Sequence, residues 1–260
     1  MRILVLLLSV LTLLTGCGHK NAADTLIVGT IAGPETELVQ TAADVAHERY
    51  GLTIKIVEFN DYNLPNAALE DGSLDANVYQ HLPYLQAATE AHGYNLEAIG
   101  KTFIYPTGIY SKKIKSLKKL PDHAMIAIPN DPSNEARALL LLKKAGLIKL
   151  KSSANTTIKD IVSNPKKLQF KELDAAQLPR VLEDVEAAVI NTTFAIPAGL
   201  KPSRDALYTE KKDSPYANLI VIRRNSDKKQ QLLLLVKALN SEEVIHKAQE
   251  LFGDGAIPAW

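Results

Sequence analysis

The sequence predicts an α/β fold built from two blocks, and three features of the 260-residue chain support this prediction. Short apolar runs typical of buried strands alternate with segments of helical spacing, which implies parallel strands joined by right-handed crossovers. Glycines follow the helical segments, as expected at helix ends. Apolar residues make up 46% of the chain, enough for one large or two modest cores.

The N-terminus is predicted to lie outside this fold. A positively charged start precedes an apolar run, residues 3–14, which is too short to span a membrane and is typical of a secretory signal. The sequence Leu-Thr-Gly-Cys17 resembles a bacterial lipobox, so we expect residues 1–16 to be a signal peptide and Cys17 to carry lipid. Residues 17–24 are small and polar, as suits a tether. The alternative is an ordinary signal that happens to contain a cysteine.

The first block is expected to hold three strands and three helices. The strands are predicted at residues 25–30, 52–59 and 74–78. The helices are predicted at residues 35–50, 65–70 and 85–92. Ligands of open α/β sheets sit beyond the strand ends, so the loops that follow these strands are candidate binding segments.

The second block repeats the alternation. Residues 96–110 hold two β-like pieces with Pro106 between them, and residues 100–108 are expected to form a strand that crosses into the new block. Further strands are predicted at 125–128, 168–173 and 187–190, and helices at 132–144, 158–162 and 175–182. The basic segment 112–119 indicates a solvated helix or turn, and 205–213 a polar return. A last strand at 218–223 and helices at 228–239 and 242–252 are expected to complete the first block.

The helix that carries Arg137 suits the binding of a small anion. Asp131 is placed as its N-cap and Pro132 at its first position. Asn134 and Arg137 lie on one face near the helix N-terminus, where free N–H groups and a guanidinium favour a carboxylate. The alternative is that Arg137 pairs with Asp131 or Glu135 at the surface, since the helix dipole contributes only about 0.3–1 kcal/mol.

Composition argues against catalysis and against a nucleic-acid partner. The formal net charge is +1, which gives no basic surface. Cys17 is the only cysteine, so the fold has no disulfide and no thiolate for a metal or for catalysis. The six histidines lack metal-site spacing, and no phosphate loop, dinucleotide fingerprint or nucleophile motif is present. We therefore expect no enzymatic activity, no metal and no cofactor.

Aromatic and amide side chains gather at the predicted strand ends. They are Tyr62, Tyr79, His81, Tyr84, Asn191 and Asn218. The tyrosine rings suit a thioether, because sulfur–ring contacts contribute about 0.3–1.5 kcal/mol each. Taken singly, each tyrosine could equally pack in the core or rim, the histidine could be structural, and each asparagine could form a turn.

Five segments together resemble the methionine-binding lipoproteins of the NlpA lipoprotein family. They are Asn60–Asn66, Asp75–Tyr84, Ile128–Leu142, Ala188–Phe194 and Asp213–Asn218, in the family's order and together with the lipobox. The resemblance implies a type II periplasmic-binding-protein fold, in which two α/β lobes joined by two crossing strands close on a ligand in the cleft between them. Lobe I is then expected to comprise residues 25–106 plus 213–260, and lobe II residues 107–212.

The resemblance also implies a role. We expect a lipid-anchored protein of the cell envelope, folded outside the cytoplasm, that captures methionine (as the L or the D enantiomer) and hands it to an ABC permease with its ATPase. Arg137 matches the family's carboxylate-binding arginine, with Asn134 beside it. Asn191 and Asn218 match asparagines of the second lobe and of the amino-group site. The aromatic wall is matched by Tyr62, Tyr79, His81 and Tyr84.

Two positions depart from the family pattern. Tyr79 stands where many relatives carry phenylalanine, and its hydroxyl is expected to admit a slightly more polar ligand side chain. Ala136 stands where many carry glycine and is expected to be neutral in a helix. Two rivals remain: the same fold binding another small amino acid, such as cysteine, or a methionine-containing dipeptide, and a surface lipoprotein that acts as an adhesin.

Overall fold

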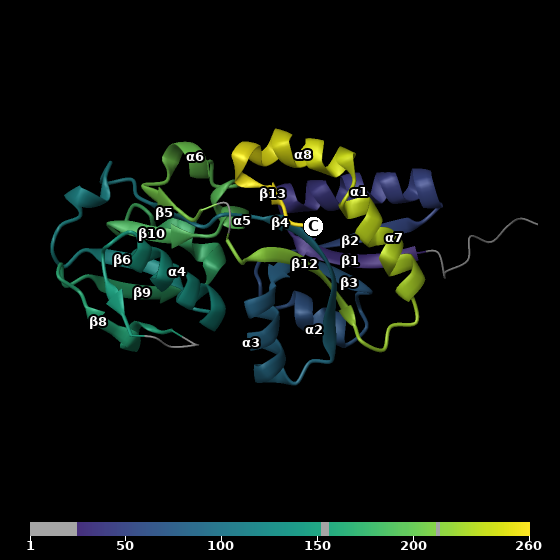
Figure 1. Ribbon diagram of the computed structural model, residues 1–260, viewed down its shortest axis with the longest axis horizontal. Coiled ribbons are helices and arrows are strands. Elements are labelled where there is room, and N and C mark those ends of the chain that lie inside the picture. Colours follow the sequence, from purple (N-terminus) through teal and green to yellow (C-terminus); the bar gives the residue numbers. More distant parts are fainter. Residues whose placement is uncertain (1–24, 152–155, 212–213) are drawn as a thin grey trace, which may run out of the picture.

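The computed structural model describes residues 25–151, 156–211 and 214–260, so the predicted signal peptide and the whole predicted tether, Cys17 included, lie outside the described residues. Two β-sheets organise the chain (Figure 1). The strand order of the six-stranded sheet is β13-β4-β12-β3-β1-β2. Its strands are β1 (Thr25–Ile31), β2 (Thr53–Phe59), β3 (Ala76–His81), β4 (Leu96–Ile104), β12 (Ala217–Arg223) and β13 (Ile257–Pro258).

The six-stranded sheet has helices on both faces (Figure 1). Strand β1 runs parallel to β2 and β3, as the alternation predicts, and β12 inserts antiparallel between β3 and β4. Strand β12, although it comes late in the chain, therefore lies in the same sheet as the strands of the first block. The helices on one face are α1 (Pro34–Tyr50), α7 (Lys229–Leu239) and α8 (Glu242–Phe252), and those on the other are α2 (Pro65–Glu70) and α3 (Leu82–His92).

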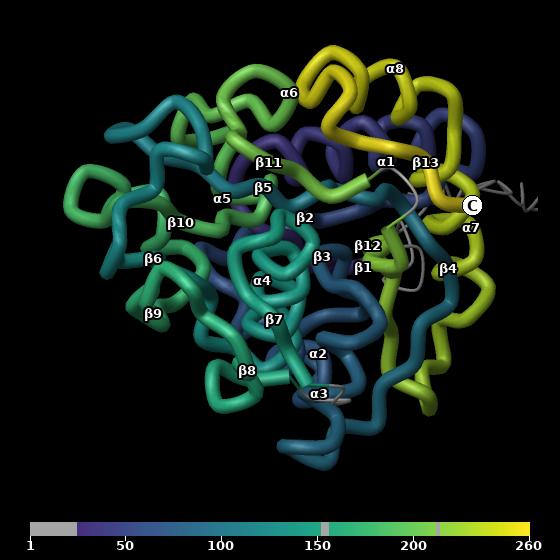
Figure 2. Tube along the Cα trace, turned by 60° about the vertical axis from the view of Figure 1, so that its left-hand side comes forward, coloured from purple at the N-terminus to yellow at the C-terminus, as the bar shows by residue number. Residues whose placement is uncertain are grey.

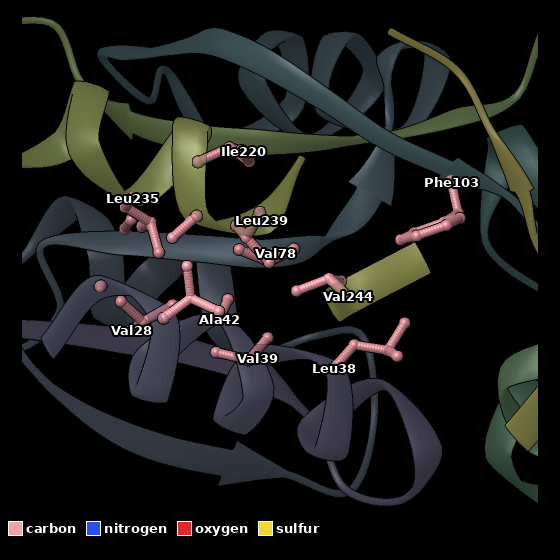
Figure 3. Close-up of a cluster of buried hydrophobic side chains, with 14 of the residues drawn as sticks. Val28, Leu38, Val39, Ala42, Val78, Phe103, Ile220, Leu235, Leu239 and Val244 are labelled. Atoms are coloured by element: carbon pink, nitrogen blue, oxygen red, sulfur yellow. The ribbon is translucent and has the colours of Figure 1, made fainter. Parts of the chain in front are cut away.

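Alternate residues of strand β12 pack on opposite faces of the six-stranded sheet. Ile220 and Ile222 point into the cluster beneath α1, α7 and α8, which Figure 3 shows with Val28, Leu38 and Leu239. Their neighbours in the strand, Leu219 and Val221, pack on the opposite side with residues of α2 and α3. Both faces of the strand are buried, so the four residues from Leu219 to Ile222 are all apolar instead of alternating with polar ones.

The five-stranded sheet has the order β11-β5-β10-β6-β9. Its strands are β5 (Gly108–Tyr110), β6 (Met125–Pro129), β9 (Gln169–Leu173), β10 (Ala187–Ile190) and β11 (Tyr208–Thr209). Strand β6 is parallel to β9 and β10, whereas β5 is antiparallel to β10 and β11. One face packs on α4 (Pro132–Lys144), and the other packs on a 3₁₀ helix (Ala175–Val181) and α5 (Thr192–Ala195).

The remaining elements are short. They are α6 (Pro202–Asp205), strands β7 (Lys149–Leu150) and β8 (Ile161–Ser163), and 3₁₀ helices Leu117–Lys119, Ile158–Asp160 and Gly253–Gly255. The chain passes between the two sheets from β4 to β5 and returns from β11 to β12, a path that Figure 2 follows in blue and then in green. The strands of the six-stranded sheet come from residues 25–104 and 217–258, and those of the five-stranded sheet from residues 108–209.

The predicted junction of the third strand with its helix and the helix predicted at 158–162 are wrong. Strand β3 continues to His81 and α3 begins at Leu82, because the His81 imidazole caps the helix by accepting the Tyr84 N–H at 3.2 Å. The helix predicted at 158–162 is a 3₁₀ turn followed by β8, which pairs with β7. There the Asp160 carboxylate accepts the backbone N–H of Thr157, closing a capping box around a single turn.

Candidate ligand-binding site

The predicted site residues converge where the ends of β3 and β10, the start of β12 and the N-terminal half of α4 meet. There, Asn191 Nδ2 donates to Asn134 Oδ1 at 2.8 Å within the half that holds the five-stranded sheet. His81 Nε2, at the end of β3 in the other sheet, lies 3.4 Å from the same oxygen and so links the two halves. Seven of the eight predicted residues are at most 8% exposed, and Tyr84 is half-buried. The site is therefore a closed, desolvated cluster.

Arg137 lies at the centre of this cluster, so the alternative of a surface ion pair with Asp131 or Glu135 is wrong. Its side chain is 4% exposed and pairs with Glu210, whose side chain is 6% exposed. Nε donates to Glu210 Oε1 at 2.9 Å and Nη2 to Oε2 at 2.5 Å. These contacts use one edge of the guanidinium and leave Nη1 for a further acceptor.

Two tyrosines of the crossing segments hold the guanidinium in place. Arg137 Nη2 also donates to the carbonyl oxygen of Tyr105, just beyond β4, at 3.0 Å. The ring of Tyr216, just before β12, stacks on it, with its centroid 4.3 Å from Cζ. Such stacking on a buried cation contributes about 0.5–2 kcal/mol. Arg137 therefore ties α4 to both connections between the sheets.

The site amides form a chain with a defined polarity. The Asp131 carboxylate accepts two hydrogen bonds from Asn134 Nδ2, at 3.1 and 3.0 Å. Asn134 therefore presents Oδ1 on its other side, where it accepts from Asn191 Nδ2. The remaining end of that amide, Asn191 Oδ1, is buried and has no hydrogen-bond partner among the residues that the structure describes. A buried acceptor without a donor costs about 1–3 kcal/mol, so this atom is placed to receive one.

His81 is neutral, and its tautomer is fixed. Nδ1 accepts the Tyr84 backbone N–H, so the proton resides on Nε2 and points at Asn134 Oδ1. Burial, together with the nearby Arg137 charge, lowers the pKa of His81 from 6.5 to about 3. Both ring nitrogens are occupied, so His81 offers a ligand its ring rather than a charge.

The tyrosines predicted to form an aromatic wall pack against one another. The ring centroids of Tyr62, Tyr79 and Tyr84 are 5.7–5.9 Å apart, and Phe194 adds a ring 4.9 Å from Tyr62. The hydroxyls of Tyr79 and Tyr84 both donate to the Tyr62 carbonyl, at 3.3 and 2.8 Å. The Tyr79 hydroxyl thus donates its hydrogen bond to a group of the protein itself, which argues against its expected role in admitting a more polar ligand side chain.

Asn218 is oriented by Glu35, a buried carboxylate at the start of α1. Asn218 Nδ2 donates to the Tyr79 carbonyl at 3.1 Å and lies 3.4 Å from Glu35 Oε2. The other carboxylate oxygen accepts from the Thr193 hydroxyl of α5. Burial raises the pKa of Glu35 from 4.5 to about 7, although both hydrogen bonds oppose the rise.

Contacts between the two sheets' segments surround the cluster. The Glu35–Thr193 hydrogen bond and the Tyr62–Phe194 ring contact join α1 and the β2–α2 loop to α5. At the rim, Asn63 Nδ2 donates to Asp174 Oδ2 at 3.0 Å. The structure thus holds the two halves of the molecule together around the candidate site.

Several site residues were not predicted from the sequence, although three of them lie only two or three positions from predicted ones. Thr193 and Phe194 stand inside the Ala188–Phe194 segment, and Tyr216 inside Asp213–Asn218. The sequence points to Glu210 only indirectly, because a buried arginine such as Arg137 needs an anionic partner. Among the described residues, no cluster of three or more His, Cys, Asp or Glu side chains could hold a metal ion, and no helix is long and apolar enough to cross a membrane.

Two α/β sheets with covering helices, linked by two crossings and meeting at a buried set of polar and aromatic side chains, define a substrate-binding protein with the type II periplasmic-binding-protein fold. More narrowly, the chain belongs to the NlpA lipoprotein family, whose model matches residues 26–260. That family consists of substrate-binding transport proteins rather than enzymes.

Individual relatives agree along nearly the whole chain. The D-methionine-binding lipoprotein MetQ of Escherichia coli (strain K12) is 47% identical over 252 residues, 95% of this chain and 93% of that protein. An ABC-transporter periplasmic substrate-binding protein from Coxiella burnetii is 60% identical, with a TM-score of 0.87 over 90% of this chain and 100% of that one. A nutrient-binding protein from Burkholderia cenocepacia, solved bound to methionine, is 52% identical with a TM-score of 0.88 and the same coverage.

Proposed function

We propose that this protein binds methionine in the buried cluster between its two lobes and delivers it to an ABC importer. The observation that carries the proposal is the combination, in one desolvated place, of a guanidinium edge, an unpartnered amide oxygen and a wall of aromatic rings. A zwitterion with an apolar tail has one group for each of these. The methionine-related names of the relatives support the same ligand.

At the carboxylate end, Nη1 of Arg137 serves as the donor. Because Glu210 already neutralises the guanidinium, the ligand adds one hydrogen bond rather than replacing an existing partner. Hydrogen bonds to charged groups contribute about 1.5–3 kcal/mol. Tyr216 and Tyr105 keep the guanidinium from rotating, so little side-chain entropy is lost when the ligand binds.

At the ammonium end, Asn191 Oδ1 is the acceptor, and Asn218 contributes its own Oδ1, since its Nδ2 already faces Glu35 and the Tyr79 carbonyl. Asn134 lies behind Asn191 and orients it. The thioether then rests against the rings of Tyr62, Tyr79, His81 and Tyr84. Because His81 is neutral, it places no charge beside the apolar tail.

The proposed cellular role follows the domain organisation. Residues 25–106 plus 213–260 form lobe I and residues 107–212 form lobe II, which close on the ligand and present a joint surface to the permease and its ATPase. Lipid on Cys17 anchors the folded part to a membrane outside the cytoplasm, and residues 1–16 are removed. No chemical step is assigned to the site, because its carboxylates and its histidine already have partners within the protein.

Competition calorimetry tests the proposal. The mature chain, stripped of co-purified ligand by unfolding and refolding, is titrated with L-methionine, D-methionine, cysteine, leucine and a methionine-containing dipeptide. We expect methionine to bind most tightly and to displace the others. If the dipeptide or cysteine bound more tightly, that compound would be assigned as the ligand instead of methionine. If none of the compounds gave a measurable heat of binding, the proposed binding function would be overturned.

A further inference from the structure

A buried acceptor at Asn191 Oδ1 is useful only if the amide cannot turn round. An asparagine amide has nearly the same shape in both orientations, and a flip would present two N–H donors instead of one oxygen. The orientation must therefore be imposed by neighbours. In this site the neighbours form a chain of hydrogen bonds that begins at a carboxylate, a group that only accepts when ionised.

We propose that Asp131, beyond its role as a helix cap, is a positioning residue that sets the polarity of the whole site and so selects ligands with a free ammonium group. Asp131 fixes Asn134 with its amide nitrogen towards the carboxylate, and Asn134 in turn fixes Asn191 with its oxygen towards the ligand. The same Asn134 oxygen faces the proton on His81 Nε2. This inference rests on the proposed function, because the selected group is the ammonium of the bound amino acid.

The geometry of Asp131 supports this assignment. Its Oδ1 accepts from the Asn134 backbone N–H and from the Ser133 hydroxyl, both at 3.0 Å, which locks the carboxylate in place. Both of its oxygens then face Asn134 Nδ2. With the opposite orientation of Asn134, its oxygen would meet the carboxylate and its nitrogen would meet two other donors, the Asn191 amide and His81 Nε2. Four contacts would be lost together, so the chain behaves as one unit.

Asp131→Asn is the informative variant. Asparagine is as good an N-cap as aspartate, so helix α4 keeps its start, but its amide can face Asn134 in either sense. The readout is the ratio of two affinities: methionine against its des-amino analogue, which keeps the thioether and the carboxylate but lacks the nitrogen. We expect the wild type to prefer methionine strongly and the variant to lose about tenfold or more of that preference.

Asp174→Asn is the matched control. Asp174 is also a helix-capping aspartate close to the site, yet it bonds to Ala176 N–H and Asn63 and to no site amide. This variant removes an equal charge and should change the affinities for both compounds alike, leaving their ratio unchanged. An equal fall of the ratio in both variants would show that charge alone sets the preference, which would overturn the inference.

Nitrogen NMR of His81 provides a second readout that needs no ligand. The wild type should show the neutral tautomer with the proton on Nε2. Asp131→Asn should keep this tautomer, because the Tyr84 N–H still donates to Nδ1, but it should shift the Nε2 resonance, because the acceptor at Asn134 is no longer fixed. An unchanged Nε2 resonance together with an unchanged affinity ratio in a folded variant would overturn the proposed relay. If the wild type bound neither compound, the proposed function would fall separately, and an Nε2 resonance unaffected by the substitution would then remove the relay as well.

Discussion

Arg137 shows how a single residue can be essential for two reasons at once. It is a candidate ligand donor, and it is also half of a buried ion pair whose other half is Glu210. Removing one partner of such a pair leaves an uncompensated buried charge, which costs about 3–5 kcal/mol of stability. Any loss of binding in a simple arginine variant is therefore confounded by damage to the fold.

A paired substitution separates the two effects. Arg137→Met alone should lower the free energy of unfolding by about 3–5 kcal/mol because Glu210 is left buried and charged. Adding Glu210→Gln should restore most of that loss, whereas methionine affinity should stay at least about tenfold below wild type. Denaturant unfolding and calorimetry measure the two quantities. Recovery of affinity in the double variant would remove the carboxylate-binding role of Arg137.

Glu35 predicts a pH dependence of stability whose sign is fixed by its surroundings. Its pKa is raised in the folded protein, so the stabilisation it gives is complete below its unfolded value of 4.5 and is lost as the pH rises through about 7. Relative to wild type, Glu35→Gln should therefore gain roughly 3 kcal/mol between pH 4.5 and 8, at about 1.4 kcal/mol per unit of pKa shift. Urea unfolding at several pH values measures this gain.

The control for that series is Glu37→Gln, an exposed glutamate in the same first turn of α1. It removes the same charge from the helix N-terminus without touching the Thr193 and Asn218 hydrogen bonds. A gain of the same size and pH dependence in the control would assign the effect to the helix dipole instead of to the burial of Glu35.

Individual site residues were predictable from the sequence when a local pattern marked them. Tyr79 and His81 follow the strand predicted at 74–78, and Asn134 stands three residues after a predicted helix cap, so position alone indicated them. Glu35 and Glu210 carried no such mark. The partners of Glu35, Thr193 and Asn218, lie 158 and 183 positions away in the chain, and Arg137, the partner of Glu210, lies 73 positions away. Only the tertiary fold brings these residues together.

Among the elements, the junction of β3 and α3 was not predicted correctly from the local sequence. The Leu82-Pro83 pair suits the first turn of a helix, but histidine is not a usual N-cap, so the sequence predicts a helix start three residues too late. Long strands and helices were predicted well because burial makes their apolar periodicity strong. The two-residue strands β7, β11 and β13 were missed because they are defined by pairing alone.

Capping of α3 by His81 can be measured directly. His81→Asn keeps an N-cap acceptor, whereas His81→Ala removes it and leaves the Tyr84 N–H without its partner. We expect the alanine variant to unfold with a free energy about 1 kcal/mol lower than the asparagine variant. Thermal unfolding of both proteins without ligand provides the comparison, and equal stabilities would contradict a capping role.

At the scale of the whole molecule, the two sheets and their helices are separate cores that meet at the site through few groups. Ligand that binds across such a junction stabilises the closed arrangement and the folded state together. At 100 times its dissociation constant, methionine should raise the free energy of unfolding by about 2.7 kcal/mol. A surface adhesin with no functional site would show no such rise with methionine or with any other amino acid.

The structure of the protein crystallised with L-methionine tests the central claim most directly. The account predicts one methionine enclosed between the lobes, with its carboxylate about 3 Å from Arg137 Nη1, its ammonium at the same distance from Asn191 Oδ1 and its sulfur against the tyrosine rings. Methionine bound in the reverse orientation, outside the junction of the two lobes, or with Arg137 Nη1 turned away from it would contradict the account.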